Sequence, residues 1–258
     1  MNSVNRSKDV RRTSASPRSR RECRFYNRKR PFVVATFAIT VDGKVTTKNF
    51  GPVDFTSRED KLHLFRQRAS ADAVLIGHTS LERDNVRLGL PTNLQELRTK
   101  RGQSRSPLRV IISNKGRIDE RLKIFQSDIS PIIVFSTKQM PQKNQKALQT
   151  KAALHLTDAK QVDLAMVLET LRNQYKVGTL ACEGGPTLFR ALLEEDLIDQ
   201  LNLTIAPHMF GGAAAPTLTG LNNKFLPASV HCSLINLRTI ENECFLTYRI
   251  KHHRRRRN

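Results

Sequence analysis

Apolar runs rich in β-branched residues alternate with segments of helical periodicity between residues 31 and 250. The first run, FVVATFAITV at 32–41, is apolar on both faces, which is typical of a strand covered by helices on both sides. Such alternation predicts an α/β domain with a mostly parallel sheet, and the last 30 residues predict an antiparallel hairpin at one edge. The chain has 258 residues, enough for one large domain of this class.

The individual elements follow from local signals. Thr56 and Glu59 have the spacing of a helix capping box, and Leu62, Phe65 and Ala69 continue the helix at its proper spacing. Further helices are predicted at 163–173, with Ala165, Leu168 and Leu171 facing inward, and at 187–195. Strands are predicted at 32–41, 73–76, 108–112, 132–135, 179–182, 201–206, 230–237 and 244–250.

The formal net charge of +21 is distributed unevenly along the chain. Residues 1–30 carry +9 and residues 251–258 carry +5, which leaves +7 for residues 31–250. Both terminal segments contain too few apolar residues to form a core, so we expect them to be disordered basic tails. A transit peptide, or a start codon assigned too far upstream, would also explain residues 1–30. The charge alone suggests an alternative function: a nucleic-acid-binding protein that acts non-specifically through its tails.

Several classes of protein are disfavoured. Cys23, Cys182, Cys232 and Cys244 form no C-x-x-C pair, which argues against zinc-ribbon and thioredoxin-type sites, and we expect no metal site. No apolar run approaches the roughly 18 residues that a membrane span needs, so we expect no membrane partner. The sequence also shows no secretory signal, and we therefore expect reduced thiols and a cytoplasmic location.

Ligands of parallel α/β sheets bind beyond the carboxyl ends of the strands, so the residues there are candidates for a binding site. The strand at 179–182 continues through Glu183, Gly184 and Gly185 into a helix that begins near Pro186. Glycines let the backbone approach a ligand closely, and the free N–H groups of a helix N-terminus favour a phosphate. A tight turn would give the same glycine pattern, but the carboxylate of Glu183 beside it favours a ligand site.

Three other segments carry polar groups near strand ends. The segment 77–85 offers hydroxyls, a carboxylate and an amide, although a surface loop can have the same composition. Asn114 and Lys115 follow the strand at 108–112, where an NAD site would need an acidic residue, so they favour the 2′-phosphate of NADP. Arg68, at the end of the first helix, either complements the helix dipole or binds a sugar phosphate.

Short motifs follow one another in a fixed order over residues 31–250: PFV at 31–33, TVDGK at 40–44, RA at 68–69, DAV at 72–74, Gly77 with DN at 84–85, PLRV at 107–110, EGGPTL at 183–188, DQL at 199–201, and AP at 206–207 with GG at 211–212. Taken together, they resemble the reductase domain of riboflavin biosynthesis, a relative of dihydrofolate reductase. The resemblance implies a dihydrofolate-reductase-like three-layer αβα fold and a homodimer.

The resemblance also implies an activity. It is the NADPH-dependent reduction of the ribosyl group of a 5-phosphoribosylamino-pyrimidine to ribityl, by hydride transfer to C1′. By matching positions, the residues expected at the cofactor are Ala38, Asp54, Ser80, Asp84, Asn114, Gly184, Gly185, Pro186, Thr187 and Leu188. Those expected at the phosphorylated substrate are Arg68, by its charge, Glu183, by accepting hydrogen bonds, and Leu88. No general acid is identified.

The sequence departs from the family pattern mainly on the substrate side. Thr36 occupies a position where relatives have Lys or Asn, and Val86 replaces a Pro. Pro91 lies near the place of a substrate-binding Arg, for which Arg87 could substitute. The chain also lacks the His-x-Glu and Pro-Cys-x-x-Cys motifs of the zinc deaminase domain found in bifunctional bacterial enzymes, so we expect a stand-alone reductase. A paralogous NADPH reductase with another small substrate is the alternative.

Overall fold

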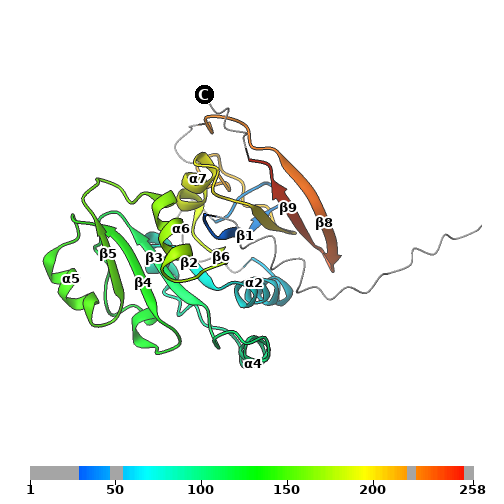
Figure 1. Ribbon diagram of the computed structural model, residues 1–258. Coiled ribbons are helices and arrows are strands. Elements are labelled where there is room, and N and C mark those ends of the chain that lie inside the picture. The colour runs from blue at the N-terminus through cyan, green and yellow to red at the C-terminus, as the bar shows by residue number, and fades with distance from the viewer. Residues whose placement is uncertain (1–28, 47–54, 220–224, 253–258) are drawn as a thin grey trace, which may run out of the picture.

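A single nine-stranded sheet forms the centre of the protein (Figure 1). The computed structural model describes residues 29–46, 55–219 and 225–252. The strands lie in the order β5-β4-β3-β2-β6-β1-β7-β9-β8, and all pairs are parallel except β7 with β9 and β9 with β8. The strands are β1 (Phe32–Thr40), β2 (Ala73–Gly77), β3 (Leu108–Ser113), β4 (Ile132–Thr137), β5 (Ala153–Thr157), β6 (Thr179–Cys182), β7 (Gln200–Ala206), β8 (Cys232–Ile240) and β9 (Glu243–Ile250).

Helices cover the sheet on both faces. Apolar residues of α6 and α7 pack on one face, and α3, α5, the short 3-10 helix η1 and the end of α2 pack on the other. The helices are α2 (Arg58–Ser70), α3 (His78–Asp84), α4 (Thr92–Lys100), η1 (Lys123–Gln126), α5 (Gln142–Gln149), α6 (Leu164–Asn173) and α7 (Pro186–Glu194). The predicted three-layer αβα architecture, with a mostly parallel sheet and a C-terminal antiparallel hairpin, is therefore confirmed.

Two of the detailed helix predictions are wrong by one residue. Ser57, not Thr56, caps α2, because its hydroxyl accepts the backbone N–H groups of Glu59 and Asp60 at 3.1 and 3.2 Å. In α6, Leu164 and not Ala165 begins the buried stripe, while Ala165 is exposed. Segment 77–85, whose composition also suits a surface loop, contains α3. The structure also adds α4, α5 and β5, which the sequence did not indicate.

The C-terminal hairpin forms one end of the sheet, and β5 with α5 forms the other (Figure 1). The turn between β8 and β9 contains Glu241, in the left-handed region at φ 52°, and Asn242, and β9 begins at Glu243. β8 is the outermost strand, and its large apolar side chains Leu234, Ile235 and Leu237 are about half exposed.

Asp199, which precedes β7, holds both ends of the domain together. Its buried carboxylate accepts hydrogen bonds from the Val33 backbone N–H at 2.8 Å, from Arg30 at 2.7 Å and from His252 at 3.1 Å. Burial acts to raise the pKa of Asp199, but the hydrogen bonds from His252 and Arg30 outweigh it and hold the pKa well below its usual range. The contacts of the domain thus reach Arg30 and His252, just beyond the predicted boundaries. The predictions for residues 1–28 and 253–258 fall outside the described residues.

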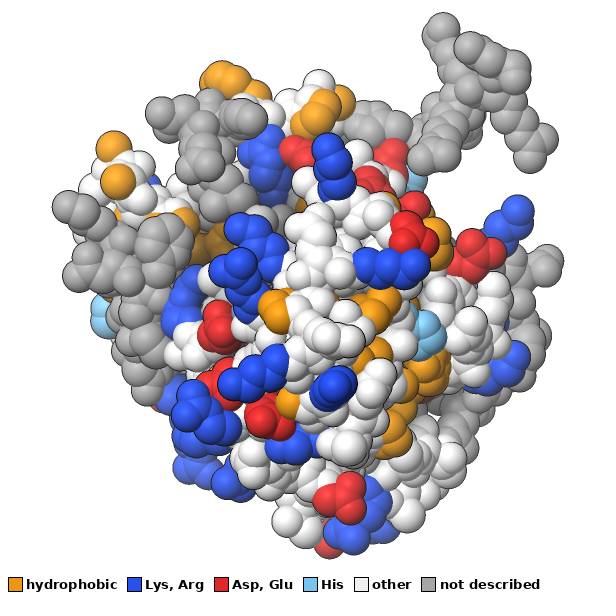
Figure 2. All heavy atoms as spheres, turned by 90° about the vertical axis from the view of Figure 1, so that its left-hand side faces the viewer, with side chains coloured by type: hydrophobic (Ala, Val, Ile, Leu, Met, Phe, Trp, Pro, Cys, Tyr) orange, Lys and Arg blue, Asp and Glu red, His pale blue; other side chains and the backbone are white. Residues whose placement is uncertain are grey.

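Charge on the described surface is mixed. Figure 2 shows Lys and Arg side chains spread over the face that carries β5 and α5, with acidic and apolar side chains among them. Cys182, Cys232 and Cys244 are free thiols, and Cys23 lies outside the described residues. Every helix within the described residues is too short or too polar to cross a bilayer.

Candidate active site

Two adjoining cavities open beyond the carboxyl ends of the parallel strands. The first, which we call the β1 cavity, has a volume of about 370 Å³ and is bounded by the second half of β1, by α2 and by the turn after β6. The second, the β3 cavity, has a volume of about 510 Å³ and is bounded by the ends of β2 and β3 and by the start of α7. Both cavities are lined by Thr46, Ser80, Arg83, Gly185 and Pro186, so they meet at the turn between β6 and α7.

Close packing explains the two glycines of that turn. A Cβ atom on Gly185 would lie 2.6 Å from the Ser80 hydroxyl oxygen, which accepts the Gly185 N–H at 3.0 Å. A Cβ atom on Gly184 would lie 2.6 Å from the end of the Leu188 side chain. Pro186 occupies the first turn of α7, where its missing N–H costs no helical hydrogen bond. The N-terminus of α7 therefore faces the meeting point of the cavities.

Arg68 and Glu183 form a two-point ion pair in the wall of the β1 cavity. Arg68 Nε donates to Glu183 Oε1 at 2.8 Å and Arg68 Nη2 donates to Oε2 at 2.6 Å, while Nη1 donates to the carbonyl of Gly89 at 2.6 Å. The side chains are only 8% and 9% exposed. A guanidinium has five N–H donors, so two of those on Arg68 are left for a ligand. The pair thus offers donors and acceptors side by side on one cavity wall.

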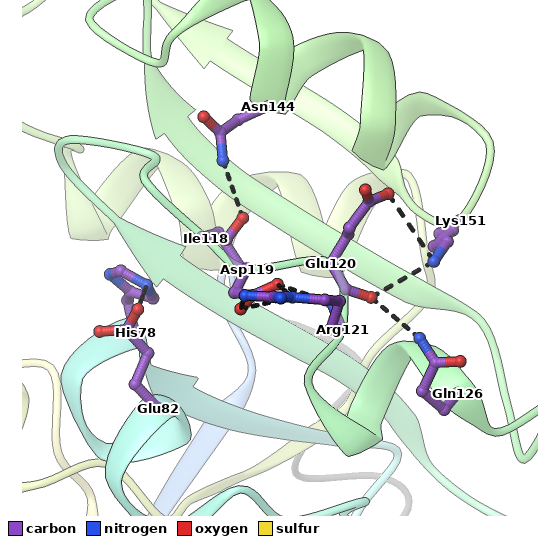
Figure 3. Close-up of polar contacts among 9 residues, drawn as sticks. All are labelled: His78, Glu82, Ile118, Asp119, Glu120, Arg121, Gln126, Asn144 and Lys151. Atoms are coloured by element: carbon purple, nitrogen blue, oxygen red, sulfur yellow. Dashed lines mark hydrogen bonds and ion pairs between the residues drawn. The ribbon is translucent and has the colours of Figure 1, made fainter.

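The segment after β3 carries Asn114 and Lys115 along the β3 cavity. Two hydrogen bonds hold Asn114 in place. Its backbone carbonyl accepts from the Thr137 hydroxyl at 2.7 Å, and its side-chain Oδ1 accepts from the Val162 N–H at 2.9 Å. Farther along, α5 holds the same segment, as Asn144 donates to the carbonyl of Ile118 at 2.9 Å. Figure 3 shows this contact, with Glu120 and Lys151 pointing toward one another and Arg121 turned back on Asp119.

The chain that forms this site matches a known family. The RibD C-terminal domain family matches residues 31–246. The chain belongs to the RibD C-terminal domain family. This confirms the resemblance that the motifs indicated.

Relatives of this RibD C-terminal domain cover most of its length. The 2,5-diamino-6-ribosylamino-4(3H)-pyrimidinone 5′-phosphate reductase of Archaeoglobus fulgidus is 27% identical over 190 residues, which are 73% of this chain and 86% of that protein. The protein of the same name from Methanothermobacter thermautotrophicus is 28% identical over 189 residues, with coverages of 73% and 83%. The solved structure of a pyrimidine reductase-like protein from Corynebacterium diphtheriae has a TM-score of 0.75 at 21% identity, covering 86% of this chain and 93% of that one. This structural likeness confirms the fold.

Most site residues predicted from the sequence lie around the two cavities of the RibD C-terminal domain, although their roles toward a ligand stay predictions. Asp54 falls outside the described residues. The β1 cavity is lined by Ala38, Arg68, Asp84, Leu88, Glu183 and Gly184, the β3 cavity by Asn114, Thr187 and Leu188, and both by Ser80, Gly185 and Pro186.

The departures from the family pattern divide into two groups. Thr36 and Val86 line the β1 cavity, so these two changes alter its wall. Pro91 caps the start of α4, and neither Pro91 nor Arg87 is among the described residues that line the cavities. The substitution of Arg87 for that arginine stays a prediction. Of the neighbouring Asp-Asn pair, Asn85 ends α3 at φ 43° and accepts the Lys123 N–H at 2.8 Å, which is a structural role.

One acidic residue of the cavity was missed by the sequence analysis. Asp60, Leu64 and Arg68 line the β1 cavity from α2 at the four-residue spacing of one helix face, and Thr56, just before the helix, lines it too. Counting back from Arg68 at this spacing would have identified Asp60. Burial raises the pKa of Asp60, and burial also raises the pKa of Asp84 against the opposing charge of Arg83.

Proposed function

We propose that this chain reduces the ribosyl group of a 5-phosphoribosylamino-pyrimidine to ribityl, using NADPH as hydride donor to C1′. The observation that carries the proposal is the meeting of two cavities at Ser80, Gly185 and Pro186. One cavity has the Arg68–Glu183 pair in its wall, and the other has the N-terminus of α7. The reductases of Archaeoglobus and Methanothermobacter, which are named for a ribosylamino-pyrimidinone phosphate, support this substrate class.

The β3 cavity fits a nicotinamide nucleotide. The glycine turn keeps the start of α7 free of side chains, and a Cβ at either glycine would meet Ser80 or Leu188. The backbone N–H groups at the start of α7 point their partial positive charge toward a phosphate. Bound there, the nucleotide would supply the hydride, while Thr187 and Leu188 would hold its phosphates.

The charge beside β3 favours NADPH over NADH. Lys115 lines the β3 cavity next to Asn114, so a cation and an amide are available for a 2′-phosphate. An NAD site would instead place a carboxylate at a strand end to bind the ribose 2′-hydroxyl.

The β1 cavity would hold the substrate. Arg68 is already neutralised by Glu183, so it would bind the substrate through its two remaining N–H donors while Glu183 accepts hydrogen bonds. Leu88, only 2% exposed and held at φ 56°, would close the same wall by apolar contact.

The direct test is oxidation of NADPH on addition of the phosphoribosylamino-pyrimidine. We expect Arg68→Ala to abolish turnover. The matched control is Arg66→Ala, on the same helix, where the side chain is 52% exposed and does not line either cavity. Normal turnover by Arg68→Ala would remove Arg68 from the substrate site, and wild-type protein that binds neither NADPH nor NADH would overturn the proposed function.

A second substrate class is favoured by one observation. Thr36 and Val86, which depart from the family pattern, both lie in the wall of the β1 cavity. A reductase with this wall could act on another small heterocycle. NADPH binding without turnover of the phosphoribosylamino-pyrimidine would favour this second candidate.

We also propose that the protein acts as a homodimer in the cytoplasm. Support for self-association comes from β8, the outer strand of the sheet, on which Leu234, Ile235 and Leu237 are half exposed. Sedimentation equilibrium of the wild type against Leu237→Lys tests the dimer, which we expect the charged variant to weaken. A wild-type monomer at all concentrations would contradict it.

A further inference from the structure

The helix α2 presents one continuous face to the β1 cavity. Asp60, Leu64 and Arg68 lie on that face, four residues apart, and Thr56 lines the cavity just before the helix begins. Asp60 and Arg68 are eight residues apart, which places their backbones ~12 Å from one another along the helix axis. A sugar phosphate that contacts Arg68 at one end would therefore extend along α2 toward the carboxyl group of Asp60.

The strands opposite Asp60 carry buried polar atoms that lack a partner. Asn202 and Thr204 of β7 are each 1% exposed; the Thr204 hydroxyl bonds to the carboxyl group of Asp60, whereas Asn202 Nδ2 makes no hydrogen bond within the described residues. Thr36 Oγ1 of β1 is also buried and makes no hydrogen bond within the described residues, and Thr36 pairs in register with Asn202. Unpartnered buried groups are costly in a folded protein, so Thr36 Oγ1, which lines the same cavity as Asp60, points to water or ligand atoms held there.

Asp60 shares the β1 cavity with the Arg68–Glu183 ion pair and with Arg83 and Asp84. Glu243 of β9 approaches from the N-terminal end of α2, where it accepts the Ser57 N–H at 2.8 Å, and Lys61 lies on α2 itself. His63, one turn farther on, stays neutral because burial and then Arg238 lower its pKa to about 4.

These surroundings raise the pKa of Asp60 above the ordinary value of an aspartate. The pKa of Asp60 is raised first by burial and further by Glu243, while the hydroxyls of Thr204 and Thr56 and the charge of Lys61 act in the opposite direction. β1 and β7 contribute only neutral groups here. Asp60 therefore lines the cavity with a carboxyl group that takes up a proton more readily than an exposed aspartate does.

We propose that Asp60 is the catalytic proton donor that opens the ribosyl ring of the substrate. This inference rests on the proposed function. The lone pair of the glycosylamine nitrogen forms the C1′=N bond, the bond between C1′ and the ring oxygen breaks, and that oxygen takes the proton of Asp60. A hydride from the reduced nicotinamide nucleotide then adds to C1′ and gives the neutral amine. Water returns a proton to Asp60, so each turnover consumes one hydride and one proton.

The test compares Asp60→Asn with Glu59→Gln in single-turnover reduction by bound NADPH. Glu59 lies one residue away on α2, has a side chain 39% exposed and does not line either cavity. We expect Asp60→Asn to slow reduction about 10²–10⁴-fold, the usual contribution of a general acid. NADPH affinity and thermal stability should stay near wild type, and Glu59→Gln should react normally.

The pH profile separates proton donation from a structural role. Because Asp60 must be protonated, the wild-type rate should fall as pH rises through its pKa, and this fall should be absent in Asp60→Asn. Thr204→Val keeps the shape of the side chain but removes a hydroxyl that lowers the pKa of Asp60, so it should move the fall to higher pH.

Three results would overturn the inference while leaving the proposed function intact. They are an Asp60→Asn variant that reduces the substrate at the wild-type rate, the same pH profile in both proteins, or loss of the falling limb in Asp84→Asn instead. A wild-type protein that binds NADPH but does not reduce the pyrimidine would instead be a failure of the proposed function.

Discussion

Replacing Glu183 by Gln should destabilise the protein strongly, because it leaves the charge of Arg68 buried without its partner. Arg68 is 8% exposed in its side chain and would keep only the Gly89 carbonyl as a full acceptor. The amide of the new Gln can accept one of the two guanidinium hydrogen bonds but presents its NH2 group to the other.

The size of the effect follows from this burial. Removing one partner of a buried ion pair costs about 3–5 kcal/mol. For a domain of this length that corresponds to a decrease in Tm of roughly 6–20 °C. Urea unfolding followed by far-UV circular dichroism gives the free energy of unfolding directly.

The double variant Arg68→Met with Glu183→Leu provides the matched comparison. Replacing both partners by apolar side chains leaves no buried charge, so we expect a stability within about 2 kcal/mol of wild type. Both variants should lose reductase activity. If Glu183→Gln were as stable as wild type, or if the double variant were the less stable of the two, the ion pair would not be the buried, coupled unit described above.

Three further predictions concern the cofactor turn, the coenzyme and acid stability. Gly185→Ala should weaken NADPH binding by tenfold or more in calorimetric titration, and Ser80→Ala should partly restore it, because the added Cβ meets the Ser80 hydroxyl. Lys115→Ala should reduce the preference for NADPH over NADH by about 10–100-fold, as a lost charge-assisted hydrogen bond does; an unchanged ratio would exclude Lys115. Because the pKa of Asp199 is depressed in the folded protein, its carboxylate stabilises the protein at pH values above 3.8, the ordinary pKa of an aspartate. This stability is lost as the pH falls toward the folded pKa. Asp199→Asn should therefore lose about 2–4 kcal/mol near neutral pH and show a flatter acid limb in urea titrations, and an unchanged limb would contradict this assignment.

Elements with strong local signals could be predicted from the sequence. The strand at the start of the domain has nine residues in the structure, Phe32–Thr40, and its apolar run predicted it almost completely. α7 was predicted within one residue, because two glycines and a proline determine where a helix can begin.

Elements that bury little apolar surface could not be predicted. α5 contributes only Leu148 to the core among its described residues, so it has almost no apolar periodicity. α3 has seven residues and no side-chain cap, and its polar sequence suits a loop equally well. In α4 the buried residue is Arg98, whose guanidinium bonds to the carbonyls of Ala69 and Ala71, a role that composition does not reveal.

The candidate site divides in the same way. The glycine turn at 183–188 is contiguous in the chain, so its residues and their use could be proposed together. Arg68 and Glu183 were each proposed for the substrate, yet they are 115 residues apart, and nothing local indicates that they bind one another. Asp60 was missed because its partner Thr204 comes from β7, near the other end of the chain.

The sequence by itself determined that this chain forms a parallel α/β sheet with polar residues at the carboxyl ends of its strands. Hydrophobic periodicity and turn chemistry act over a few residues, and they are sufficient for that. Only the tertiary structure decided which strand ends are neighbours. β6 lies between β2 and β1, and α2 lies across the same end of the sheet. Lateral strand order depends on long-range packing, and this order brings Glu183 to Arg68 and Asp60 to the buried hydroxyl of β7.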